Sequence, residues 1–147
     1  MILSPHFKLV EFTRSATATA RHIDNTPSEA VVANLTRICQ EILEPLRTFA
    51  GQPIIIGSGY RCPALNKAVG GVPNSQHQTG EAVDIHIPDN ATGMKWFTWM
   101  MHNLKFDQLI KEKATKTSTT FWIHVSLRAN GNQRQHVIYN LIKNPNA

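Results

Sequence analysis

Two short segments alternate between apolar and polar side chains, and this period of two constrains the fold most. Residues 82–87 (Ala-Val-Asp-Ile-His-Ile) and 122–126 (Trp-Ile-His-Val-Ser) both follow it. Alternation of this kind is typical of a strand with one face on the core. The side chains expected to share the faces opposite the apolar ones are Asp84 and His86 in the first segment and Trp122, His124 and Ser126 in the second.

The remaining patterns predict an α+β fold in one domain over residues 1–147. Apolar residues from Val31 to Leu46 repeat with a helical period, which predicts a helix capped by Thr26, bent by Pro45 and ended at Gly51. Residues 1–26 are expected to be an irregular lead-in. The other expected elements are helices at 63–69 and 92–104 and strands at 53–56, 82–87, 106–112, 121–127 and 136–141, with 106–112 and 121–127 forming an antiparallel hairpin.

The charge balance is basic, with 15 Lys+Arg against 10 Asp+Glu and a net charge of +5. The positive residues are scattered along the chain, so they indicate a general attraction to polyanions but do not identify a particular one. No apolar run is long enough to span a membrane. The amino terminus lacks a secretory pattern, so we expect synthesis in the cytoplasm. Cys39 and Cys62 are expected to be reduced thiols, although they would pair if the fold brought them together.

The strongest chemical signal is the segment Ser75-Gln-His-Gln-Thr-Gly-Glu-Ala-Val-Asp84. A loop that reverses at Gly80 would bring His77 to Asp84, and His124 lies in an alternating strand further along the chain. Two histidines and one carboxylate are a normal ligand set for catalytic Zn²⁺, with a fourth position left for water. Taken singly, each residue has an ordinary alternative as a loop or sheet histidine or an ion-paired carboxylate.

These residues belong to a larger pattern, and through it the chain resembles the zinc D-Ala-D-Ala metallopeptidases of peptidoglycan, in the branch common in phage lysins. The resemblance covers nearly the whole chain. The motifs that carry it are Ser58-Gly59-Tyr60-Arg61, Ser75-x-His77-x-x-Gly80-x-Ala82-x-Asp84, Phe106-Asp107-Gln108-Leu109-Ile110 and Trp122-Ile123-His124-Val125-Ser126.

The resemblance implies that His77, Asp84 and His124 bind zinc on a small antiparallel sheet flanked by helices, as in the similar hedgehog domain. It also implies that Arg61 lies near the substrate and the developing oxyanion, where a guanidinium is suited to carboxylate or carbonyl oxygen. The alternative for Arg61 is a structural tie between loops.

The catalytic base is less clear from the sequence. Several relatives have an acid three positions before the last histidine, where this chain has Phe121. Glu112 follows in the phase of Gln108 and Phe106, and similar proteins have a glutamate there, so we predict Glu112 as the base; its alternative is an exposed hairpin charge. Two other acids are set aside: Asp107 is expected on the opposite face with a structural role, and Glu81 is expected to point away from Asp84.

Three further residues, Ser75, Gln108 and His86, are predicted to contact the substrate, although His86 has the alternative of an ordinary sheet histidine. The implied function is zinc-dependent hydrolysis of D-Ala-containing bonds in stem peptides or cross-links, as a D,D-carboxypeptidase or an endopeptidase. A monomeric phage or prophage lysin that reaches the cell wall after holin-type release is expected.

Two other classes of function compete with the enzyme. A zinc-stabilised, non-catalytic wall-binding or interaction module is favoured by the missing acid at Phe121. A basic nucleic-acid-binding protein would leave the two histidines and the aspartate unexplained, so we expect no nucleic-acid partner.

Overall fold

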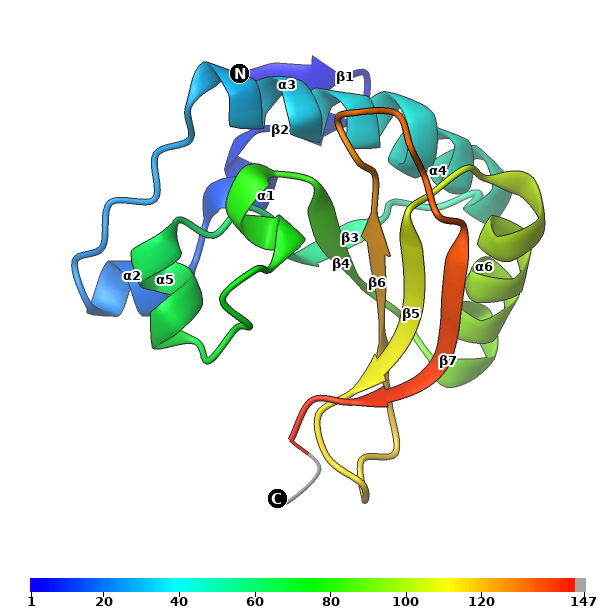
Figure 1. The fold of residues 1–147 in the computed structure, drawn as a ribbon. Helices are drawn as coiled ribbons and strands as arrows, with labels where there is room; N and C mark the ends of the chain where they lie inside the picture. Colours follow the sequence, from blue (N-terminus) through cyan, green and yellow to red (C-terminus); the bar gives the residue numbers. More distant parts are fainter. Residues whose placement is uncertain (145–147) are drawn as a thin grey trace.

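The computed structural model describes residues 1–144, which form a five-stranded sheet with long helices packed on one of its faces (Figure 1). No helix among these residues has the length and apolar character needed to cross a bilayer. The helices are α1 (Val10–Thr13), α2 (Ala16–Ala20), α3 (Glu29–Ile38), α4 (Glu44–Ala50), α5 (Pro63–Ala68) and α6 (Asn90–Asn103). The strands are β1 (Ile2–Ser4), β2 (Phe7–Lys8), β3 (Ile55–Ser58), β4 (Ala82–His86), β5 (Gln108–Lys113), β6 (Trp122–Ser126) and β7 (His136–Ile142).

The large sheet has the strand order β3-β4-β6-β5-β7, and the α+β class expected from the sequence is confirmed. Its first four strands pair antiparallel, including the β5–β6 hairpin. Strand β7 differs, because it pairs with β5 in parallel. The chain between β6 and β7 therefore crosses the sheet beside the first residues of β5. The expectation that all strands are antiparallel is wrong for β7.

The first long helix starts two residues later than its sequence pattern predicts. Ser28 is the N-cap, and its Oγ accepts a hydrogen bond from the Val31 amide at 3.3 Å. The Thr26 hydroxyl instead donates to Asp24 at 2.6 Å. A π-helical segment, Cys39–Leu43, joins α3 to α4, and Pro45 lies in the first turn of α4. The chain is helical on both sides of Pro45, so its missing N–H falls inside a continuous helix, directly after the π-helical turn.

Residues 1–26 are not an irregular lead-in, because β1, β2, α1 and α2 all fall within them. Phe12 is completely buried, and the Glu44 carboxylate accepts hydrogen bonds from the Ser4 hydroxyl at 2.6 Å and the His6 amide at 2.9 Å. Elements this short have too few residues to show a period, and contacts with α4 hold them in place.

The apolar faces of β4 and β6 meet the helices as the alternation predicts. Val83, Ile85, Ile123 and Val125 are fully buried and belong to the same core as residues of α3 and α6. Cys39 and Cys62 are both free thiols, as expected. The face of the sheet that the long helices leave uncovered carries the polar residues of these strands.

Candidate metal centre

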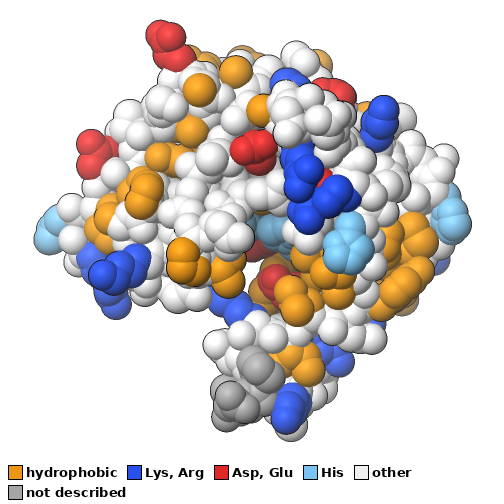
Figure 2. All heavy atoms as spheres, viewed as in Figure 1, with side chains coloured by type: hydrophobic (Ala, Val, Ile, Leu, Met, Phe, Trp, Pro, Cys, Tyr) orange, Lys and Arg blue, Asp and Glu red, His pale blue; other side chains and the backbone are white. Residues whose placement is uncertain are grey.

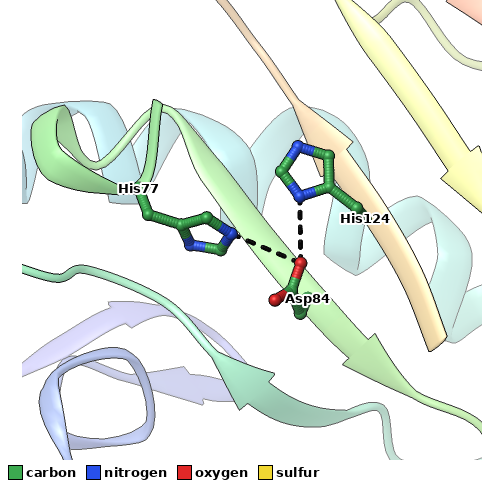
Figure 3. Close-up of side chains that lie close together, drawn as sticks. All are labelled: His77, Asp84 and His124. Atoms are coloured by element: carbon green, nitrogen blue, oxygen red, sulfur yellow. Dashed lines mark hydrogen bonds and ion pairs between the residues drawn. The ribbon is translucent and has the colours of Figure 1, made fainter. Parts of the chain in front are cut away.

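His77, Asp84 and His124 lie together, and their ligand atoms are within 4.8 Å of one another (Figure 3). His77 Nε2 is 3.3 Å from Asp84 Oδ1, and His124 Nδ1 is 3.0 Å from the same oxygen. His77 is 3% exposed, and the other two side chains are largely buried. The fold therefore brings together three residues that are far apart along the chain.

The ring of His77 is held in a defined tautomer by the backbone. Its Nδ1 lies 2.7 Å from the carbonyl oxygen of Gly59, which can only accept, so Nδ1 carries the proton. Nε2 is therefore the ring nitrogen that faces Asp84 and is available to a metal ion. Gly59 has no room for a side chain, because a Cβ there would come within 2.6 Å of the Phe12 carbonyl oxygen.

The loop that carries His77 reverses at Gly80, as the sequence predicts. Residues Gln76–Thr79 form a 3₁₀ turn, and the Ser75 hydroxyl accepts from the His77 amide at 3.2 Å. Gly80 follows with a φ of 74°, in the left-handed region that favours glycine. Its Cβ position is also only 2.8 Å from Val31 Cγ1, so the turn packs closely on α3.

Asp84 and His124 face each other as a cross-strand pair of β4 and β6. Burial would raise the pKa of Asp84, but the imidazoles of His77 and His124 outweigh it and hold this pKa well below its ordinary value. Burial would lower the pKa of His124, whereas its hydrogen bond to Asp84 raises it above the ordinary value. The cluster thus keeps the aspartate ionised as a ligand must be.

A cleft of about 600 Å³ opens over this cluster. In the space-filling view it is a hollow in the middle of the face (Figure 2). Residues from six stretches of the chain line it. Those of functional interest besides the cluster are Arg61, Ser75, Gln108, Glu112, Arg128 and Arg134. Of the residues that the structure describes, Glu112 and Asp84 are the only acids in this lining.

Glu112 and Arg61 lie at the metal end of the cleft. Glu112 faces Trp122 across the β5–β6 hairpin, two residues before His124 in the partner strand. Burial raises the pKa of Glu112 above its ordinary value, and the negative charge of Asp84 adds to this shift. Burial lowers the pKa of Arg61, although Asp84 and Glu112 act in the opposite direction. Arg61 Nη2 also donates to the Ser75 hydroxyl at 3.4 Å, so Arg61 ties two loops together.

Two details depart from the sequence expectations. Phe106 is fully buried in the core instead of sharing the side of Gln108 and Glu112, because β5 and its alternation begin only at Gln108. His86 is exposed and is not part of the cleft lining, since it lies at the end of β4 opposite Ile55. Its predicted contact with substrate therefore has no support from position.

Two cleft residues were missed by the sequence reasoning, namely Arg128 and Arg134. Both pair with Asp107, which is completely buried. This buried ion pair explains the structural role expected of Asp107. The excess of basic residues in the composition was a general signal, but no spacing in the sequence connects Asp107 to arginines that follow the next strand.

The donor set suits zinc. Two imidazole nitrogens and a carboxylate oxygen converge, one imidazole has its second nitrogen on a backbone carbonyl, and this is the usual arrangement for a histidine that ligates a metal. No curated protein matches the chain. The Peptidase M15 family model matches residues 5–126, which include all three residues of the cluster. The chain therefore belongs to the Peptidase M15 family of zinc D-Ala-D-Ala metallopeptidases.

Proposed function

We propose that the protein is a zinc-dependent peptidase that cleaves D-Ala-containing peptide bonds of peptidoglycan, acting as a phage or prophage lysin. The observation that carries this proposal is the position of Glu112 in the same cleft as His77, Asp84 and His124. It supplies the carboxylate that Phe121 does not, since the Phe121 side chain is buried beside the core. A purely zinc-stabilised binding module would have no need of a second acid at this place.

In this proposal His77, Asp84 and His124 hold the zinc ion, which supplies a Lewis acid for the scissile carbonyl and lowers the pKa of water. Glu112 accepts a proton from the attacking water at its carboxylate and delivers it to the leaving amine. Arg61 directs its guanidinium at the oxygen on which negative charge develops. Arg61 is suited to this role because the loop contacts with Ser75 and the His77 carbonyl fix its backbone and side chain.

The cleft offers further groups to a bound peptide. Gln108 lies on its lining, with its amide group 3.4 Å from His136 Nδ1 and its backbone N–H on the Ser126 hydroxyl. We propose that the Gln108 amide hydrogen-bonds the peptide backbone. Ser75 is placed in the same lining, but its hydroxyl already accepts from His77 and Arg61, so its contribution is to position these two residues.

The test is hydrolysis of purified peptidoglycan and of a D-Ala-D-Ala peptide by the zinc-loaded protein, with products identified by mass spectrometry. We expect Glu112→Gln to lower kcat by about 100- to 10,000-fold without loss of zinc, as for a general base. His77→Ala should lose both zinc and activity. Glu29→Gln, at an exposed position on α3, is the matched control and should behave as wild type.

The products also separate the two modes of cleavage. Release of free D-alanine from the peptide identifies a carboxypeptidase, whereas cut cross-links or shortened stems identify an endopeptidase. If the zinc-loaded wild type leaves both substrates intact, the enzyme proposal is wrong. If Glu112→Gln keeps the wild-type rate, the general base is another group.

A further inference from the structure

The end of the cleft beyond the candidate metal centre is built around a buried carboxylate and two arginines. Arg134 binds both oxygens of Asp107 through one side of its guanidinium group, with Nε donating to Oδ1 at 2.9 Å and Nη2 to Oδ2 at 2.8 Å. Arg128 Nε lies 3.1 Å from Oδ1. Asp107 is 0% exposed, whereas the two arginine side chains are 32% and 47% exposed and line the cleft. The two arginines therefore pair with the buried Asp107 carboxylate and also reach the surface of the cleft.

This arrangement leaves positive charge and donors directed away from Asp107. Two guanidinium groups face a single carboxylate, so one positive charge is not compensated within the group. Each guanidinium has five N–H donors. Among the residues that the structure describes, none is hydrogen-bonded to Nη1 of Arg134 or to Nη2 of Arg128. A carboxylate is the natural partner of such paired, planar donors.

Both arginines follow β6 in the chain, after His124, the last residue of the candidate metal centre. Arg128 follows His124 by four residues, at the end of β6, so at most about 13 Å of chain lies between them. The acids of the cleft lining, Asp84 and Glu112, both belong to the metal end. Figure 2 shows Lys and Arg side chains gathered at one edge of the hollow. A ligand carboxylate at this edge would meet positive charge and no acidic side chain of the lining.

We propose that Arg128 and Arg134, held by Asp107, form a subsite for an internal carboxylate of the peptide substrate, two to four residues from the bond that is cut. An extended peptide spans about 3.3 to 3.6 Å per residue, so two to four residues cover separations up to that limit of about 13 Å. The inference rests on the proposed function, because it assumes that a peptide occupies the cleft.

The test compares two D-Ala-D-Ala peptides that differ at one internal position, D-glutamate in one and D-glutamine in the other, three residues before the final one. A ketomethylene group replaces the amide between the two D-alanines, so that binding is measured without turnover. Calorimetry with the zinc-loaded full chain should give about tenfold tighter binding of the glutamate peptide, a typical gain for charge-assisted hydrogen bonds. The preference should shrink as salt is added.

Arg128→Gln and Arg134→Gln should each remove most of this preference while leaving the affinity for the glutamine peptide within about threefold. Each variant keeps one arginine on Asp107, and circular dichroism verifies its fold. Lys95→Gln removes the same charge from an exposed position on α6 and should keep the preference. If Arg134→Gln does not fold, Arg134→Lys replaces it and should reduce the preference, since lysine lacks the planar fork.

Equal binding of the two peptides by wild type, or an unchanged preference in the arginine variants, would overturn the proposal. This outcome is distinguishable from failure of the proposed function. A protein that prefers the glutamate peptide but leaves peptidoglycan intact keeps the subsite and loses the peptidase assignment. A protein that cleaves peptidoglycan but shows no such preference keeps the peptidase assignment and loses the subsite.

Discussion

Two groups of side chains that border one cleft share a pattern of charges and differ in chemistry. At each of them one aspartate lies between two basic side chains. Asp84 lies between the imidazoles of His77 and His124, whereas Asp107 lies between the guanidinium groups of Arg128 and Arg134. An imidazole can give up a proton and present a lone pair, but a guanidinium in a protein does not. The first group is therefore able to bind a metal, and the second is a permanent ion pair.

The two aspartates also differ in how completely the protein satisfies them. Asp107 is closed off from solvent and accepts hydrogen bonds from the backbone N–H of Arg134 at 3.1 Å and the Gln76 amide at 3.1 Å in addition to its arginines. Asp84 keeps 16% of its side chain exposed to the cleft. A carboxylate that is fully paired stabilises the fold, and one that is left partly open remains available to a ligand.

The largest effect should be seen in zinc binding. Asp84→Asn is expected to lower the affinity for zinc by at least about 100-fold, since even partners that only orient metal ligands contribute 10- to 100-fold. Asp107→Asn should change the zinc affinity by less than about threefold, because the Asp107 carboxylate is paired with two arginines and is not part of the His77, Asp84 and His124 group. Competition with a chromophoric chelator measures both. Equal losses in the two variants would show that the sites are not separate.

The next effect should be seen in the stability of the zinc-free protein. Asp107→Asn is expected to lower the free energy of unfolding by about 3 kcal/mol, the usual cost of breaking a buried ion pair. Urea denaturation of the chelated protein measures it. Asp24→Asn, at an exposed turn, is the matched control and should cost less than about 0.5 kcal/mol. A loss at Asp107 no larger than at Asp24 would mean that the arginine pairs add nothing to stability.

The stabilisation that Asp107 provides should depend on pH. Hydrogen bonds from Arg134 lower the pKa of Asp107 from 3.8 to about 2, although burial acts against them. A lowered pKa in the folded protein means that the stabilisation is complete above the ordinary value and is lost as the pH falls through this range. The gap in unfolding free energy between wild type and Asp107→Asn should therefore close between pH 4 and pH 2, measured by urea denaturation. A gap that stays constant would assign the loss to packing.

The smallest effect is expected at the residue that joins the two sites. Gln76 donates to Asp107 and immediately precedes His77. Gln76→Ala should cost about 1 kcal/mol of unfolding free energy, a typical value for one hydrogen bond, because the arginines remain. Zinc affinity should fall by less than about tenfold. A larger fall would show that the Asp107 cluster positions the loop of His77.

Much of the metal site follows from the sequence for local reasons. The alternation in β4 and β6 determines that Asp84 and His124 share a face, and Gly80 marks the reversal before Asp84. The resemblance to zinc D-Ala-D-Ala metallopeptidases is confirmed by the family match. The α+β class follows from helix and strand periods, which depend on neighbouring residues alone.

What could not be predicted depends on contacts between distant segments. The prediction that Phe106 shares the face of Gln108 was wrong. Pairing with β6 and β7 determines where β5 begins, and the apolar pattern does not show it. The short elements of residues 1–26 are held by partners such as Glu44. The arginines of the cleft were missed for the same reason, since only the crossing between β6 and β7 places them on Asp107.

The parallel pairing of β7 also has a consequence for how the molecule assembles. Strands β5 and β6 are joined directly and pair over a short loop, whereas the contact of Gln108 with His136 must close a much longer one. Loop-closure entropy favours the hairpin first, so Glu112 and His124 should be brought together before β7 docks. Until then β5 is an open edge that could pair with another chain. Strand β7, which completes the cleft, thus also covers the edge of β5 and takes its place as the edge strand of the folded sheet.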